Sequence, residues 1–98
     1  MATDDVTLDA LRQRVTDIDR QLMTLVAERK RVSGEVARVK RATGYPTRDF
    51  ERERDVILGV RTMATELGVS PALAEDLLRL LIRSSLTTQE QASVVARS

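Results

Sequence analysis

An arginine occupies a position where the surrounding pattern predicts an apolar residue. Steps of three and four residues place ten positions on one stripe of a single long helix. Nine of them, here called the apolar seam, are Leu8, Leu11, Val15, Ile18, Leu22, Leu25, Val32, Val36 and Val39. The tenth is Arg29. Because burying a guanidinium costs several kcal/mol unless an opposite charge meets it, Arg29 indicates an anionic ligand.

Two further basic residues flank the apolar seam. Lys40 follows Arg29 by close to three helical turns, so the two point to nearly the same side, about 16 Å apart along the axis. Alternatively, Lys40 extends its charge to the surface. Arg12 lies about 42 Å from Lys40 within one helix. In an antiparallel pair of helices centred near Val26, however, Arg12 of one chain would lie beside Lys40 of the other. Taken alone, Arg12 is better explained as a surface arginine.

The start of a second expected helix carries charged groups close together. Asp49 can cap this helix, and Arg52 and Glu53 follow in its first turns. Glu53 falls on the inward line of the helix, so a carboxylate, a guanidinium and free backbone N–H groups are expected there. The simpler alternative is that Glu53 only stabilises the helix N-terminus.

Two polar residues extend the apolar stripe of a third expected helix. Ser85 and Gln89 are four residues apart and continue the line of Leu78, Leu81 and Ile82. Buried polar groups need partners, so the pair indicates a polar pocket, although fraying of the helix end would explain it too.

Taken together, these side chains suit the binding of a small polyanion and the stabilisation of charge on it. No nucleophile–base pair, metal-ligand cluster or glycine-rich phosphate loop accompanies them in the sequence. We therefore expect neither covalent chemistry nor a metal or cofactor.

The elements that must position these residues are all helical. The first helix is predicted at about residues 7–42 and is ended by Gly44 and Pro46. The second follows Asp49 and ends at a Gly68 cap. Ser70-Pro71 starts the third helix. This helix is expected to be about 20 residues long, with its helical pattern weakening over 92–98. No alternating strand pattern is present, so the prediction is an all-α chain, one single helical domain over residues 1–98.

The first helix is too long to be covered by its own chain. About 36 residues span roughly 54 Å, whereas a compact domain of this size has a radius of gyration near 13 Å. Two copies packed antiparallel about a two-fold axis would bury each other's seam. A parallel coiled coil is the competing arrangement, but it gives the shorter helices no common core. The sequence therefore predicts an intertwined antiparallel homodimer.

Composition narrows the class further. The 98 residues carry a formal net charge of +1, so no overall field attracts nucleic acid or an anionic membrane. There is no Cys and no His, which argues against disulfides and zinc. No apolar run reaches membrane-spanning length, and the N-terminus lacks the pattern of a signal peptide. A soluble cytoplasmic protein is expected.

The chain resembles the all-helical chorismate mutases of the AroQ class over about residues 8–91. The residues that carry the resemblance are Leu11-Arg12, Ala27-Glu28-Arg29, Val36-Ala37-Arg38-Val39-Lys40, Arg48-Asp49, Arg52-Glu53-Arg54 and Ser84-Ser85-Leu86-Thr87-Thr88-Gln89. The family fold is an intertwined dimer of three-helix chains with two active sites. The resemblance implies rearrangement of chorismate to prephenate, on the route to phenylalanine and tyrosine.

The resemblance also implies a role for each polar residue. Arg29 and the partner chain's Arg12 would clamp the two carboxylates of chorismate. Lys40 and Gln89 would donate to its ether oxygen. Glu53, with the backbone near Asp49, would hold the ring hydroxyl. Arg52 and Ser85 would complete the pocket.

Two alternatives compete with this interpretation. A sister activity on the same fold eliminates pyruvate from isochorismate, although Glu53 and Ser85 suit the mutase pocket better. The other alternative is a helical dimerisation or regulatory module without catalysis. Such a module would have no use for inward-facing Glu53 and Gln89.

Overall fold

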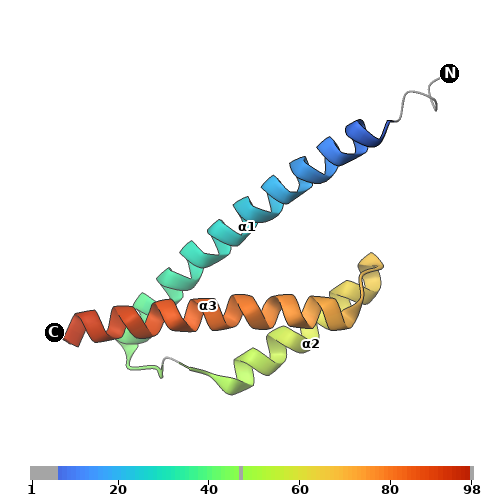
Figure 1. Cartoon of the computed structure of the whole chain (residues 1–98). Helices are drawn as coiled ribbons and strands as arrows, with labels where there is room; N and C mark the ends of the chain where they lie inside the picture. The colour runs from blue at the N-terminus through green and yellow to red at the C-terminus, as the bar shows by residue number, and fades with distance from the viewer. Residues whose placement is uncertain (1–6, 47, 98) are drawn as a thin grey trace. The chain divides into compact units, whose positions relative to one another are not determined.

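Three helices make up the described chain. The computed structural model describes residues 7–46 and 48–97, with side chains in these ranges up to Thr88. Within them the helices are α1 (Leu8–Thr43), α2 (Phe50–Leu67) and α3 (Pro71–Arg97), and no strand is present (Figure 1). The all-α, three-helix prediction is therefore confirmed.

The expected caps define both ends of α2 and the start of α3. Asp49 accepts a hydrogen bond from the Arg52 backbone N–H at 3.0 Å. Gly68 adopts the left-handed conformation, with φ of 72°, which suits a residue without a Cβ. The Ser70 hydroxyl accepts from the Leu73 N–H at 3.3 Å, and Pro71 opens α3. Each cap satisfies backbone groups that a helix end leaves without partners.

The predicted end of the third helix was wrong. The helix does not fade after about 20 residues but runs 27 residues to Arg97. Its last part, QASVVAR, contains neither Gly nor Pro, so nothing in the local sequence stops helix propagation.

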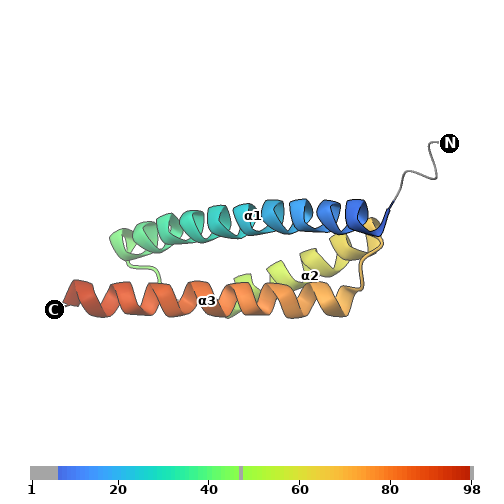
Figure 2. The same ribbon diagram turned by 45° about the horizontal axis from the view of Figure 1, so that its top comes forward.

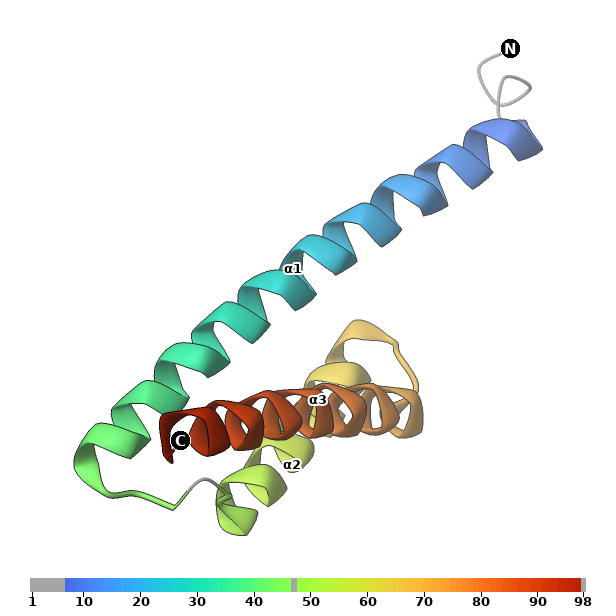
Figure 3. The same ribbon diagram turned by 60° about the vertical axis from the view of Figure 1, so that its left-hand side comes forward.

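The chain divides within α1 into two compact units, one ending at Arg31 and the other beginning at Val32. The first contains the N-terminal part of α1. The second contains the C-terminal part of α1 together with α2 and α3. In the second unit α2 and α3 lie side by side and cross while running in opposite directions (Figure 2, Figure 3).

Among the described residues of the second unit, four of the five buried positions hold small residues, namely Ala37 of α1, Ala64, Ala74 and Ser85, and the fifth holds Ile57. On α2 these are Ile57 and Ala64, and on α3 they are Ala74 and Ser85. Each pair is separated by close to a whole number of turns, so each helix buries one face. Small side chains allow two helix backbones to approach closely, whereas the larger Leu73 and Leu80 of α3 remain exposed.

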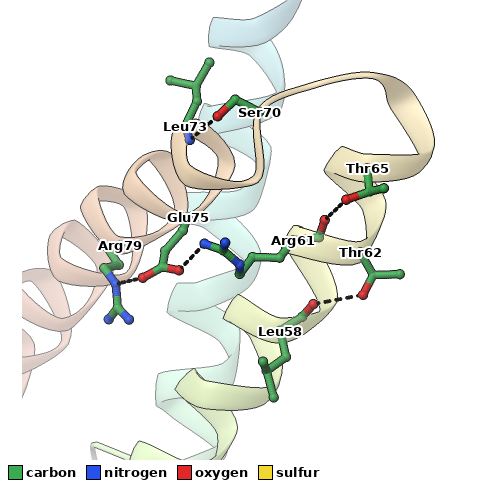
Figure 4. A network of polar contacts seen from close by, with 8 residues as sticks. All are labelled: Leu58, Arg61, Thr62, Thr65, Ser70, Leu73, Glu75 and Arg79. Carbon is green, nitrogen blue, oxygen red and sulfur yellow. Dashed lines mark hydrogen bonds and ion pairs between the residues drawn. The ribbon is translucent and has the colours of Figure 1, made fainter.

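An ion-pair network links α2 to α3 (Figure 4). The Glu75 carboxylate of α3 contacts Arg61 of α2 at 2.7 Å and Arg79 of α3 at 2.9 Å. Hydrogen bonds from Arg79 and Arg61 lower the pKa of Glu75 below its ordinary value. Since all three groups are accessible to water, the network contributes little to the free energy of folding. It restricts the relative orientation of α2 and α3 instead.

The apolar seam of α1 is exposed along its whole length. The exposed fraction of its nine residues lies between 41% at Leu22 and 62% at Leu8. On the part of α1 within the second unit, the covered side is instead formed by Ser33, Ala37 and Lys40. None of the helices in the described ranges combines the length and apolar character needed to cross a bilayer.

Candidate functional site

A cationic groove lies between α2 and α3. It has a volume of about 160 Å³ and is lined by Arg48, Glu53, Ile57, Arg79, Ile82, Arg83 and Leu86. Three guanidinium groups face one carboxylate in this lining, so the local charge is positive although the chain is nearly neutral. The apolar side chains come from one face of each helix. An arrangement of this kind favours a small, partly apolar anion.

Glu53 lies at the start of α2 and is held by an arginine. The exposed fraction of its side chain is 22%. Arg48 donates to both of its oxygens, from Nε to Oε2 at 3.0 Å and from Nη2 to Oε1 at 3.2 Å. The Arg48 guanidinium also lies 4.4 Å from the centre of the Phe50 ring. The prediction that Glu53 faces inward fits its partial burial.

Asp49 and Arg52 are joined by the helix cap. The Asp49 carboxylate accepts the Arg52 backbone N–H, so this carboxylate has a structural partner of its own. The expectation for Asp49 concerned the nearby backbone rather than its side chain, and it stays a prediction. The Arg52 residue is exposed at the surface of α2.

Lys40 and Ser85 belong to the same unit as the groove. Ser85 is buried, with 9% of its surface exposed. Lys40 is partly buried in the last turn of α1, and its carbonyl accepts the Tyr45 N–H at 2.9 Å where the helix ends. Lys40 lies on the covered side of α1 together with Ala37, and its role in the site stays a prediction.

The remaining predicted residues lie elsewhere. Arg12 is exposed and Arg29 is partly exposed, and both belong to the unit that ends at Arg31. Gln89 is in α3, and its side chain is outside the described residues. The second unit thus contains Lys40, Asp49, Arg52, Glu53, Ser85 and the backbone of Gln89.

Three arginines of the groove were not among the predicted site residues. Arg79 and Arg83 are four residues apart and flank the stripe of Ile82 and Leu86, a spacing that places them on one side of α3. Arg48 precedes the Asp49 cap, and no helical periodicity applies to a residue outside a helix. The first two could have been found from their spacing, whereas Arg48 could not.

Fold and site together define an all-helical protein with a groove lined by three arginines and one glutamate. Comparison with known families specifies this further, since residues 11–90 match the model described as chorismate mutase type II. The chain belongs to this family. The resemblance found in the sequence is therefore confirmed.

Individual relatives fall into two groups by length. The chain is 39% identical over 82 residues to a T-protein of Enterobacter agglomerans, and 32% identical over 88 residues to a bifunctional chorismate mutase/prephenate dehydratase of Escherichia coli (strain K12). These matches cover 84% and 90% of this chain but only 22% and 23% of those longer proteins. A chorismate mutase of Methanocaldococcus jannaschii is 29% identical over 84 residues, which cover 86% of this chain and 85% of that protein.

Proposed function

We propose that the protein is an isomerase that rearranges chorismate to prephenate in phenylalanine and tyrosine biosynthesis. The observation that carries the proposal is the family match over residues 11–90, together with a cationic groove that contains Glu53. The relative named chorismate mutase is covered over 85% of its length.

The chemistry requires charge and shape rather than a nucleophile. One C–O bond breaks as one C–C bond forms, and negative charge grows on the ether oxygen. In the proposal, Arg29 and the partner's Arg12 clamp the two carboxylates with forked guanidinium geometry. Lys40 and Gln89 donate to the ether oxygen, where a donor stabilises the transition state more than the substrate. Holding the reactive conformer lowers the barrier further.

The other predicted residues bind parts of the substrate that do not react. Glu53 and the backbone near Asp49 hold the ring hydroxyl, and Arg52 and Ser85 complete the pocket. The partial burial of Glu53 and the burial of Ser85 support this assignment. No metal or cofactor takes part in the proposed reaction.

The proposal includes an intertwined antiparallel homodimer of single-domain chains. Its support is the apolar seam, whose residues are 41% or more exposed in one chain. An exposed apolar stripe of this length marks a contact surface, and a second α1 offers the matching stripe about a two-fold axis. Arg12 would then enter the site of the partner. A cytoplasmic location is also part of the proposal.

The test is the loss of chorismate absorbance on addition of the purified protein, with prephenate identified as the product. Isochorismate assayed in parallel distinguishes the mutase from the sister lyase. Prephenate formed rapidly from chorismate, with isochorismate unchanged, would support the proposal. A well-folded dimer that leaves chorismate unchanged would contradict it and favour the regulatory module.

Replacing Gln89 with glutamate should confine activity to acidic pH. A protonated carboxyl group can donate a hydrogen bond to the ether oxygen, whereas a carboxylate only accepts. We expect kcat/KM at pH 7.5 to fall about 100-fold, which is the loss typical of removing one hydrogen-bond donor to the transition state. Activity should recover as the pH falls below 5. The measurement is a pH profile of both proteins. Gln91→Glu, two positions further along α3, serves as the control, and a Gln89→Glu variant fully active at pH 7.5 would contradict the role.

A further inference from the structure

The Arg48–Glu53 ion pair has the geometry of a fixed support. The two hydrogen bonds run from different nitrogens of Arg48 to different oxygens of Glu53, at 3.0 and 3.2 Å. Such forked pairing holds both planar groups in one orientation, which a single contact does not. The contact therefore determines how the Glu53 carboxylate is turned.

The guanidinium itself is held from a second side. Its carbon lies 4.4 Å from the centre of the Phe50 ring, a cation–π distance. Between Arg48 and Phe50, the Asp49 cap fixes the path of the chain into α2. Arg48 and Glu53 occupy the two positions that a hydrophobic staple joins across a helix N-terminus. Here an ion pair takes the place of the apolar contact.

The paired carboxylate remains able to bind a ligand. Arg48 supplies one hydrogen bond to each oxygen, and each carboxylate oxygen can accept two. One acceptor position per oxygen is thus left, and both residues line the same groove. If Arg48 were absent, the terminal torsion of Glu53 would be broad and roughly two-fold, and water would compete for the carboxylate.

We infer that Arg48 is a positioning residue for substrate binding, which orients Glu53 toward the substrate hydroxyl. This inference rests on the role proposed for Glu53. Arg48 itself need not touch the substrate. It acts by restricting the conformers of Glu53 before the substrate arrives, which lowers the ordering cost of binding.

The inference predicts a change in KM rather than in kcat. The ring hydroxyl keeps its proton and its charge throughout the rearrangement, so a contact to it is equally favourable in substrate and transition state. Arg48→Gln should raise KM about tenfold, a factor typical of groups that orient a ligating residue, and change kcat less than about twofold. Arg48→Lys keeps the positive charge but cannot form the two-pronged contact, so its KM should lie between those of the wild type and Arg48→Gln.

A double-mutant cycle separates this role from the alternatives. Kinetics are measured for Arg48→Gln, Glu53→Gln and the double variant. If Arg48 acts through Glu53, the double variant has the KM of Glu53→Gln alone. If Arg48 contacts the substrate directly, the two increases multiply, and the inference is overturned. Arg20→Gln, an exposed arginine on α1, is the control and should leave KM unchanged.

Two further measurements keep the outcome clear. Thermal unfolding of Arg48→Gln, followed by circular dichroism, detects a merely structural role for Arg48. In that case Tm would fall while KM at 25 °C stayed the same, and the inference would be overturned. The Nε–H NMR resonance of Arg48 should shift in Glu53→Gln, and an unshifted resonance would show that the pair is absent. A wild-type protein without mutase activity contradicts the proposed function instead, and the NMR result still decides the contact.

Discussion

Replacing Lys40 with alanine is expected to lower kcat/KM for chorismate about 1,000-fold, the upper range for loss of one preorganised donor. In the proposed reaction its ammonium group faces the oxygen on which negative charge grows. The partial burial of Lys40 strengthens such an interaction, because water screens it less. Since the contact improves as the bond breaks, most of the loss should appear in kcat. Steady-state kinetics with both proteins at equal concentration provide the measurement.

The control for this variant is Lys30→Ala. Lys30 is also on α1 but is exposed, so its loss should change kcat/KM less than about twofold, as expected for a surface residue. Both variants should retain the helical circular dichroism signal. A Lys40→Ala protein with more than a tenth of wild-type kcat would show that Lys40 is not the principal donor.

Mixing two variants that are each expected to be inactive tests whether Arg12 is supplied across the proposed dimer. Random exchange of Arg12→Ala and Lys40→Ala chains makes about half of the dimers mixed, and each mixed two-fold dimer has one intact site only if Arg12 comes from the partner. Activity should then recover to about a quarter of the wild-type value. If both residues came from one chain, every site would lack one of them, and mixing would restore nothing.

Aspartate at Ile18 should prevent dimer formation. Ile18 belongs to the apolar seam, and in the proposed dimer its side chain is buried against the partner. An unpaired buried carboxylate costs roughly 3 kcal/mol. Because the substitution occurs twice in a two-fold dimer, the Kd of dissociation should rise about 10,000-fold. Sedimentation equilibrium over a range of protein concentrations measures this change.

Met23 provides a closely matched control. In the single chain the exposed fractions of Ile18 and Met23 are 57% and 59%, so a change to aspartate removes similar apolar surface from each. Met23, however, is not part of the seam. We expect Met23→Asp to remain dimeric and active. Equal behaviour of the two variants would contradict the antiparallel pairing along the seam, and a monomeric wild-type protein would contradict the dimer itself.

Local sequence signals were sufficient to predict the helices and most of their ends. Asp49 and Ser70 accept backbone N–H groups through their side chains, and Gly68 donates its own N–H, each to or from a residue three or four positions away. Signals of this range are contained in the sequence itself. The end of α3 was predicted too early because apolar residues become sparse after Leu86, yet neither Gly nor Pro ends the helix before Arg97.

The packing of α2 against α3 was less predictable. The apolar stripe of Leu78, Leu81 and Ile82 is only partly buried, whereas Ala74 is buried. Periodicity identifies the inward face of a helix but not which residues lie at the crossing, where small side chains are required. The Arg48–Glu53 pair was missed for a similar reason, since it depends on how the segment before α2 approaches the helix.

The short turn between α2 and α3 has a consequence for the order in which the protein assembles. Only Gly68 to Ser70 separate the two helices, so the entropy lost in closing this hairpin is small, and contacts that are local in sequence form fast. The groove would therefore take shape within each newly made chain. In the proposed dimer, the seam would be covered only after a second chain diffuses to it. Formation of the complete site would then be limited by the rate at which two folded chains associate. The rate of protein synthesis in the cell would set the chain concentration, and so the time that each chain spends as a monomer.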